Sequence, residues 1–294
     1  MILAVASGKG GTGKTTVSLN LARARGGANT QLLDCDVEEP NARLFLEGQI
    51  DSSQEITIPV PLVDAKLCDG CNACGEFCEY NAIVSFGNAP LVFPEMCHGC
   101  GGCMKVCPQR AIQETEKRIG VIETLQSGNI MLAYGLLDVG VAMAPPLIRA
   151  VKKRCRTDMP VILDAPPGTS CPVIATLQGV EFVLLVTEPT PFGLYDLRLT
   201  VDVTRALDIP VGVVVNRVGI GDERVHAFCR KENIPVLMEI PDDRGIAEAY
   251  SRGELIVETY PKYQKRFQEL FDRVEYLALQ NVSSTASTYG SHTH

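Results

Sequence analysis

The sequence lacks the features expected of a membrane-spanning, secreted or nucleic-acid-binding protein. No apolar stretch approaches the roughly 20 residues of a spanning helix, and only a few apolar residues precede Gly8, too few for a secretory signal. Tryptophan is absent, and 27 Lys and Arg face 35 Asp and Glu, which gives a net charge of −8. We therefore expect no integral membrane span and no nucleic acid as the main partner.

Cysteine, by contrast, is plentiful, and eight of the twelve cysteines fall into two copies of one spacing. The copies are Cys68-x2-Cys71-x2-Cys74-x3-Cys78 and Cys97-x2-Cys100-x2-Cys103-x3-Cys107. Each cysteine of the first copy recurs 29 residues later, and Ala82-Ile83 recurs as Ala111-Ile112. This self-similarity indicates duplication of a whole unit.

The spacing, with Pro108 after the last cysteine, is the pattern of bacterial ferredoxins, in which the fourth cysteine of each run binds the other cluster. It predicts two 4Fe–4S clusters with crossed ligands: Cys68, Cys71, Cys74 and Cys107 for one, and Cys97, Cys100, Cys103 and Cys78 for the other. Zinc and disulfides are the alternatives. Neither accounts for the x2, x2, x3 spacing.

Three details around these runs carry further expectations. The first run departs from the pattern because Glu79, rather than proline, follows its last cysteine. His98 lies between two predicted ligands, and we expect it to donate a hydrogen bond rather than to bind metal. Of the cysteines outside the runs, Cys171 follows an Asp-Ala-Pro-Pro-Gly loop and is expected near the nucleotide or a dimer interface, whereas the others are expected to be small apolar side chains: Cys35, Cys155 and Cys229.

A phosphate-binding loop opens the chain, because Gly8 to Thr15 satisfies G-x4-G-K-S/T. In such a loop backbone N–H groups converge on phosphate oxygens, Lys14 reaches the β and γ phosphates, and Thr15 binds Mg²⁺. The nucleotide-binding set is Gly8, Lys9, Gly10, Gly11, Thr12, Gly13, Lys14, Thr15 and Thr16. The glycines also fit the G-x-G-x-x-G of a dinucleotide site with an acid at Asp34, but that alternative does not explain Lys14 or the apolar strand that ends at Asp164, a Walker B acid.

The remaining pattern alternates buried strands with helices, which is typical of an α/β fold with a mostly parallel sheet. We place a P-loop ATPase domain at residues 1–58 and 116–280, a small inserted α+β domain at 59–115, and a flexible tail at 281–294. An amphipathic helix is expected from Lys262 to Leu279. The expected strands are Ile2–Ala6, Gln31–Asp34, Ile130–Tyr134, Val161–Asp164, Phe182–Val186, Val211–Asn216 and Val236–Ile240.

Lys9 within the loop, Leu33-Asp34-Cys35-Asp36 and Asp164-Ala165-Pro166-Pro167-Gly168-Thr169 resemble the deviant-Walker-A ATPases of the SIMIBI class, which include MinD, ParA, nitrogenase iron protein and Mrp-type cluster carriers. The segments 36–41 and 188–193 are similar to a MinD-superfamily branch with an inserted ferredoxin-like domain. Mrp-type carriers bind a bridging cluster through a Cys-x-x-Cys near the C-terminus. This chain has no such pair there.

The resemblance implies an ATP- and Mg²⁺-dependent dimer, either a homodimer or a heterodimer with a paralogous ATPase. Lys9 would reach the partner's nucleotide, Lys14 would bind its own, and Asp36 would position the attacking water. Asp164, with Asp36 and Thr15, would hold the magnesium shell. Asn216 would read the adenine edge beside the loop at Pro241-Asp242.

Three functions remain open from the sequence. The ATPase could control electron transfer or metallocluster assembly through two clusters, with a redox or metallocluster protein as partner. It could be an iron–sulfur carrier or scaffold, or a MinD/ParA-like positioning ATPase with redox-sensing clusters. Because eight interlocked ligands favour stable clusters over transferable ones, we prefer the first. Oxygen-sensitive clusters imply a reducing, cytoplasmic location.

Overall fold

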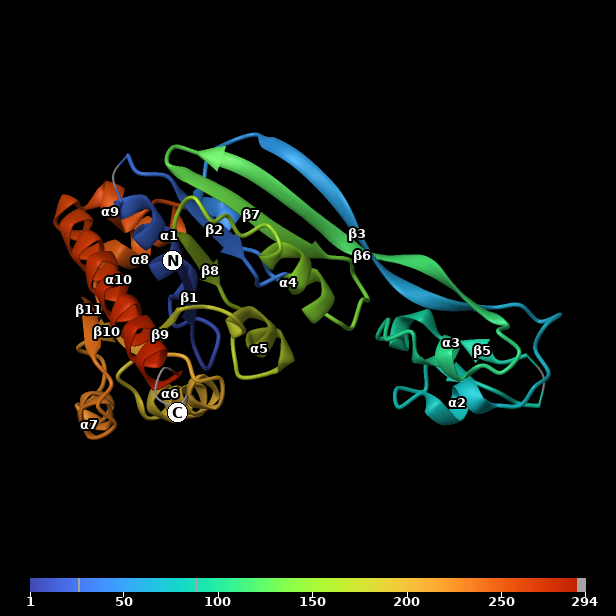
Figure 1. Ribbon diagram of the computed structural model, residues 1–294. Coiled ribbons are helices and arrows are strands. Elements are labelled where there is room, and N and C mark those ends of the chain that lie inside the picture. The colour runs from blue at the N-terminus through green and yellow to red at the C-terminus, as the bar shows by residue number, and fades with distance from the viewer. Residues whose placement is uncertain (26, 88, 290–294) are drawn as a thin grey trace.

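The computed structural model describes residues 1–25, 27–87 and 89–289, with side chains up to residue 280. Its centre is a nine-stranded sheet in the order β11-β10-β9-β1-β8-β2-β7-β6-β3 (Figure 1). The first seven strands in this order pair in parallel, which confirms the predicted mostly parallel sheet. They are β1 (Ile2–Ala6), β2 (Thr30–Asp34), β7 (Ile130–Leu137), β8 (Val161–Asp164), β9 (Phe182–Thr187), β10 (Val211–Val218) and β11 (Val236–Pro241).

Helices cover both faces of this sheet, so its central strands are buried along their whole length and carry mostly apolar side chains. One face packs against α1 (Lys14–Ala24), α8 (Arg244–Ser251), α9 (Ile256–Thr259) and α10 (Pro261–Tyr289). The other face packs against α4 (Pro145–Lys152), α5 (Cys171–Leu177), α6 (Pro191–Ala206) and α7 (Arg224–Lys231). A short 3₁₀ helix, η1 (Ala42–Phe45), follows β2.

Two long antiparallel strands leave the sheet at one edge. β3 (Ile50–Val63) pairs with β6 (Ile112–Ser127) along its length, but β6 pairs with β7 only from Gly120 onward. The outer halves of β3 and β6 therefore form a two-stranded ribbon that projects from the sheet and carries residues 64–111 at its end (Figure 1). We call residues 64–111 the insert.

The duplication predicted from the cysteine spacing is present in the backbone of the insert. α2 (Ala73–Phe77) and α3 (Gly102–Val106) are offset by the same 29 residues, and each follows a left-handed residue, Asn72 with φ 61° and Gly101 with φ 68°. Asn81 and Arg110 repeat this at φ 52° and 51°. The rest of the insert is β4 (Ile83–Val84), β5 (Leu91–Val92) and η2 (Pro94–Met96).

Some elements differ from the expectation. The predicted boundaries at 58/59 and 115/116 fall inside β3 and β6, whose exposed polar residues give no clear strand pattern. The sequence analysis also did not predict α5, α8 and α9. α10 continues to Tyr289, where a flexible tail was expected, since residues 281–289 contain no Gly or Pro to end a helix. Residues 290–294 lie outside the described residues. Among the described residues, no helix is both long and apolar enough to cross a membrane.

Candidate nucleotide site and cysteine cavities

The P-loop connects β1 to α1 at the carboxyl edge of the sheet, where ligands of such sheets bind. Gly13 precedes α1 with φ 94°, and its carbonyl accepts the first helical hydrogen bond, from Val17 N at 2.9 Å. Gly8 is required by a close approach, because a Cβ there would lie 2.4 Å from the carbonyl oxygen of Asp196 in α6. The loop thus presents its N–H groups at a helix N-terminus, which suits phosphate.

Two polar atoms beside this loop fit a nucleotide and its cation. Asp164 Oδ1 accepts a hydrogen bond from Ser18 Oγ at 3.0 Å. Asp164 Oδ2 and Thr12 Oγ1 are buried and, within the described part of the chain, make no hydrogen bond. Buried polar atoms normally have partners, so these two are suited to a hydrated Mg²⁺ and a phosphate oxygen. Lys14 is buried nearby, with 7% of its surface exposed.

The ends of β2 and β8 bring three carboxyl groups together. Burial raises the pKa of Asp36 to about 6, with Lys14 opposing the rise and Asp164 adding to it. Burial also raises the pKa of Asp34 and of Asp164. This crowding of acids is the arrangement that a divalent cation stabilises in its ionised form.

Asp34 has a structural task that the sequence did not reveal. Its two carboxyl oxygens accept hydrogen bonds from Asp36 N and Ala42 N, each at 3.0 Å. It therefore fixes both ends of the segment that carries Asp36. That segment also lines a cavity of about 530 Å³ together with Pro166, Pro167 and Ser170 of the loop after β8.

Lys9 forms an ion pair within its own chain. Its Nζ lies 3.2 Å from Glu188 Oε2, and Arg217 Nη1 lies 3.0 Å from Glu188 Oε1. The side chain of Glu188 is only 8% exposed, so this carboxylate depends on its two cations. Glu188 and Arg217 were not predicted as site residues. The sequence offered only their positions as a signal, since Glu188 begins the segment 188–193 and Arg217 directly follows Asn216.

Asn216 is brought to the P-loop. Its Nδ2 donates to Thr12 O at 2.8 Å and lies against Gly13. Asp242 N donates to Val218 O at 3.0 Å, so Pro241, the last residue of β11, and Asp242 lie beside the end of β10. The predicted base-side residues therefore share one edge of the sheet with the P-loop.

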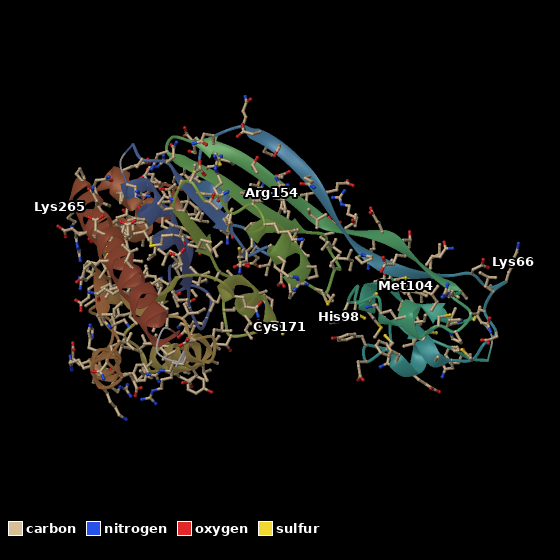
Figure 2. The ribbon with its side chains drawn as sticks, in the orientation of Figure 1. Lys66, His98, Met104, Arg154, Cys171 and Lys265 are labelled. Carbon is tan, nitrogen blue, oxygen red and sulfur yellow. The ribbon has the colours of Figure 1, made fainter. Side chains whose placement is uncertain are left out.

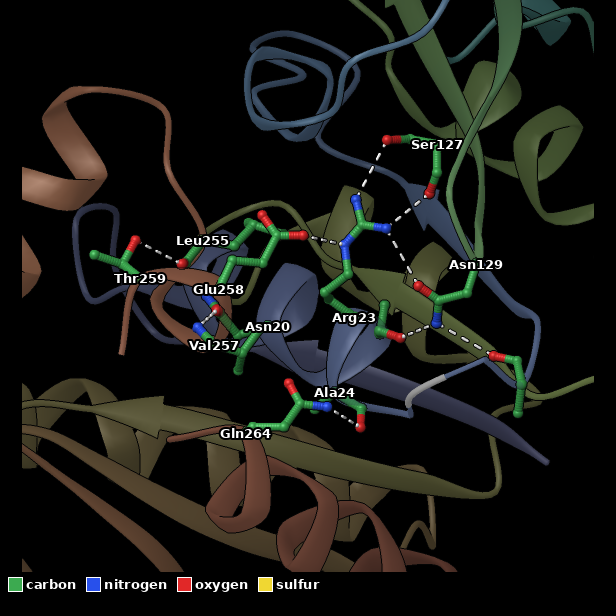
Figure 3. Close-up of polar contacts among 12 residues, drawn as sticks. Asn20, Arg23, Ala24, Ser127, Asn129, Leu255, Val257, Glu258, Thr259 and Gln264 are labelled. Atoms are coloured by element: carbon green, nitrogen blue, oxygen red, sulfur yellow. Dashed lines mark hydrogen bonds and ion pairs between the residues drawn. The ribbon is translucent and has the colours of Figure 1, made fainter. Parts of the chain in front are cut away.

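A polar cluster ties α1, the helix that begins at the P-loop, to the β6–β7 turn, at the end of β6 farther from the insert (Figure 3). Arg23 Nη1 donates to Ser127 O at 3.0 Å and to Asn129 Oδ1 at 3.3 Å, and its Nε lies 3.0 Å from Glu258. Asn20 Oδ1 accepts a buried hydrogen bond from Val257 N at 2.9 Å. These contacts join α1 to the β6–β7 turn and to α9.

The insert contains two cavities, and each is lined by four cysteines in the crossed combination predicted from the sequence. The cavity nearer the sheet, here called the proximal cavity, has a volume of about 300 Å³ and is also lined by Pro59, Val60 and Pro61 of β3. The distal cavity, of about 10 Å³, includes Val63 and Ile112 from the outer end of the ribbon. Their cysteines are Cys78, Cys97, Cys100 and Cys103 for the proximal cavity, and Cys68, Cys71, Cys74 and Cys107 for the distal one.

Backbone amides near the cysteines suit thiolate ligands. Ala82 N donates to Cys78 Sγ and Ala111 N donates to Cys107 Sγ, both at 3.3 Å. Hydrogen bonds to cluster sulfurs are a recognised means of tuning iron–sulfur sites. Among the described residues, no three His, Cys, Asp or Glu side chains converge closely enough to hold a single metal ion.

The cysteines outside the two runs are dispersed. Cys35 and Cys229 are buried, and burial raises the pKa of Cys229 to about 11. Cys155 is half-buried. Cys171 is exposed at the start of α5, on the side of the ATPase domain nearer the insert (Figure 2).

Comparison with known proteins decides the family. The sequence profile of the CobQ/CobB/MinD/ParA nucleotide-binding domain matches residues 3–256. The chain belongs to this family. It is thus a P-loop ATPase of the MinD/ParA type, and its fold agrees, since MinD of Pyrococcus furiosus superposes with a TM-score of 0.59 at 23% identity, over 94% of this chain and 98% of that one.

Two relatives extend the similarity of this MinD/ParA-type ATPase. Protein MJ0579 of Methanocaldococcus jannaschii is 34% identical, covering 86% of this chain and 90% of its own. A protein named iron-sulfur cluster carrier protein, from Aquifex aeolicus, is 27% identical, covering 88% of this chain and 62% of its own. A second solved neighbour, MinD of Pyrococcus horikoshii with Mg-ADP, has a TM-score of 0.58 at 22% identity, over 94% of this chain and 96% of that one.

Proposed function

We propose that this chain is a Mg²⁺-dependent ATPase whose nucleotide-dependent dimer controls electron transfer or metallocluster assembly through two 4Fe–4S clusters in a ferredoxin-like insert. The observation that carries the proposal is the pair of cavities, each lined by three cysteines of one run and the fourth of the other. That crossed set is the ligand pattern of two-cluster ferredoxins. The four thiolates of a cubane bind four different irons, and so lie further apart than ligands of one zinc ion.

In the proposed mechanism the nucleotide is held by the P-loop amides and by Lys14, with Thr15 and Asp164 on the magnesium shell. Asp36, fixed by Asp34, orients the attacking water. Lys9 leaves Glu188 and reaches the nucleotide of the second subunit, where it offsets charge that develops on the transferred phosphoryl group. Bound clusters supply one-electron chemistry at the cysteine cavities.

A continuous set of contacts supports coupling between the two parts. Leu137 N donates to Val37 O at 2.9 Å, so the segment after Asp36 is bonded to the end of β7. At that end Asp138 pairs with Arg118 of β6, which also pairs with Glu55 of β3. A change in the position of Asp36 would therefore be transmitted to the base of the ribbon that carries the insert.

A second candidate function is cluster delivery, favoured by the relatives named iron-sulfur cluster carrier proteins. Stable interlocked ligation argues for electron transfer or maturation instead. The two are separated by incubating the iron-loaded chain with a cluster-free ferredoxin and asking whether iron leaves this chain.

The coupling test uses anaerobically reconstituted full chain. We expect about eight irons per chain, and cluster potentials or partner affinity that differ between ADP and a nonhydrolysable ATP analogue. Eight irons with identical properties in both nucleotide states would reduce the protein to an ATPase with an uncoupled electron carrier. A chain without iron would overturn the proposal altogether.

A further inference from the structure

The two halves of the insert, although duplicated, have diverged at most positions between the cysteines and directly after them, and four of the diverged positions flank the last cysteine of each run. In the first run these positions are Glu76, Phe77, Glu79 and Tyr80, and 29 residues later they are Lys105, Val106, Pro108 and Gln109. All four residues of the first set line the proximal cavity, and of the second set Gln109 lines the distal one. Because the two halves share a backbone, the difference lies in the surface chemistry around each cavity.

The proximal cavity has an exposed aromatic rim. Phe77 is 48% exposed and Tyr80 is 45% exposed. The Tyr80 ring stacks on His98, with centroids 3.4 Å apart and an interplanar angle of 9°. Cys100, one of the four cysteines of this cavity, is itself exposed. Exposed apolar side chains gathered at one site mark an interaction surface.

The charge of this rim is of one sign. Glu76, Glu79 and Glu114 line the proximal cavity, and none of its described lining residues is Lys or Arg. The acid that lines the distal cavity is Asp69. Its carboxylate already accepts hydrogen bonds from Gln109 Nε2 at 2.9 Å and from Cys71 N at 3.1 Å. The Glu79 departure from the ferredoxin pattern thus places an additional negative charge at the proximal rim.

The proximal rim also lies on the side of the insert nearer the nucleotide-binding domain. Figure 2 shows His98 on that side and Lys66 at the opposite end. A partner seated at the rim would therefore be within reach of the ribbon base, where Arg118 pairs with Glu55 and Asp138. The distal end offers no such neighbour.

We propose that the rim formed by Glu76, Phe77, Glu79, Tyr80 and His98 is the docking surface for a redox protein whose own contact face carries Lys and Arg around an apolar centre. This inference rests on the proposed function, since it names the partner class of the proximal cluster site. An acidic ring around exposed aromatic rings complements such a face. It repels nucleic acid and anionic small molecules.

The test measures binding with a redox-inert basic protein, zinc-substituted cytochrome c, titrated into the iron-loaded full chain. The double substitution Glu76→Gln and Glu79→Gln should weaken binding about three- to tenfold at low salt and flatten its salt dependence. The matched control, Glu47→Gln with Asp51→Asn, changes the net charge equally at exposed positions away from the rim. It should leave binding within about twofold.

A second readout uses carbodiimide, which joins carboxylates to lysines in contact. Cross-links from the probe should map to Glu76, Glu79 or Glu114. Equal weakening by both double variants, or cross-links spread over the whole chain, would overturn the docking surface. Cross-links that join the rim to a second copy of this chain would also overturn it.

Iron is counted on the same preparations to separate the two claims. A wild-type chain without iron overturns the proposed function and the docking proposal with it. The docking surface alone is overturned if a chain with about eight irons binds the basic probe no better than it binds cytochrome c whose lysines have been neutralised by acetylation.

Discussion

The nucleotide-binding domain and the insert are held together by different forces. The sheet of the domain is buried between two layers of helices, and side chains such as Leu3, Leu33, Val183 and Leu184 have no exposed surface. The buried apolar cluster of the insert contains, among the described residues, Cys74, Ile83 and, from the end of the ribbon, Ile112; Ala82 and Ala111 are also buried. The domain therefore has an extensive apolar core, whereas the insert has a small one.

The difference has an energetic consequence. Burying one large aliphatic side chain contributes about 1.5–3 kcal/mol, while ordering the backbone costs about 1–2 kcal/mol per residue. These few and mostly small buried side chains do not offset the ordering of residues 64–111. Metal–thiolate bonds can supply the remainder, as they do in other small metal-binding units. The comparison predicts that the insert depends on its clusters and the domain does not.

The largest expected effect is at a cluster ligand. Cys68→Ser should lower the iron content from about eight to about four per chain and make the insert sensitive to trypsin at Lys66, Lys105 or Arg110. ATP binding should persist, because the sheet has its own core. Iron analysis and limited proteolysis provide the measurement, with Cys155→Ser as the control outside both runs. Loss of nucleotide binding in Cys68→Ser would show that the two parts fold as one unit.

The next effect separates the two lysines of the P-loop. Lys14→Ala should abolish nucleotide binding, because in the proposed mechanism Lys14 binds the phosphates of its own subunit's nucleotide. Lys9→Ala should retain binding and lose hydrolysis by a factor on the order of 10³ or more, if Lys9 acts like an arginine finger. Calorimetric nucleotide titration and single-turnover hydrolysis distinguish them. The same loss of binding in both variants would assign Lys9 to its own subunit.

A third prediction concerns stability of the domain alone. Arg23→Met removes hydrogen bonds to Ser127 O and Asn129 Oδ1 and leaves these partly buried oxygens without that donor. The free energy of unfolding should fall by about 1–3 kcal/mol. Lys265→Met, which removes an exposed pair with Glu269, should cost less than about 0.5 kcal/mol. Denaturant unfolding measures both, and the iron content should not change. A destabilisation of equal size in the two variants would contradict the role given to Arg23.

The two regions also differ in how much of their structure the sequence predicted. The parallel strands and the P-loop were predictable, because buried strands are mostly apolar and a phosphate loop needs glycines at fixed positions. The crossed cysteine sets were predictable because a duplicated spacing constrains both halves. β3 and β6 were not, since most of residues 50–55 in β3 and 113–118 in β6 are exposed and polar, and so show no alternation of apolar and polar side chains. The role of Glu188 comes from tertiary contacts with Lys9 and Arg217, and that of Asp34 comes from a loop conformation that brings two nearby amides to its carboxylate; no sequence pattern encodes either.

The smallest expected effect tests the connection between the regions. Arg118 is exposed and pairs with Glu55 and Asp138 at the ribbon base, so Arg118→Met should change the melting temperature little. It should nevertheless reduce any difference in hydrogen exchange of β3 between ADP and a nonhydrolysable ATP analogue, because Arg118 is the side chain that connects Asp138, next to Leu137, to Glu55 of β3. Arg156→Met, which removes another exposed pair, with Asp158, serves as the control. A nucleotide-dependent exchange pattern that survives Arg118→Met unchanged would show that the coupling does not pass through this ion-pair bridge, and would leave the backbone pairing of β6 with β7 or the second subunit to carry it.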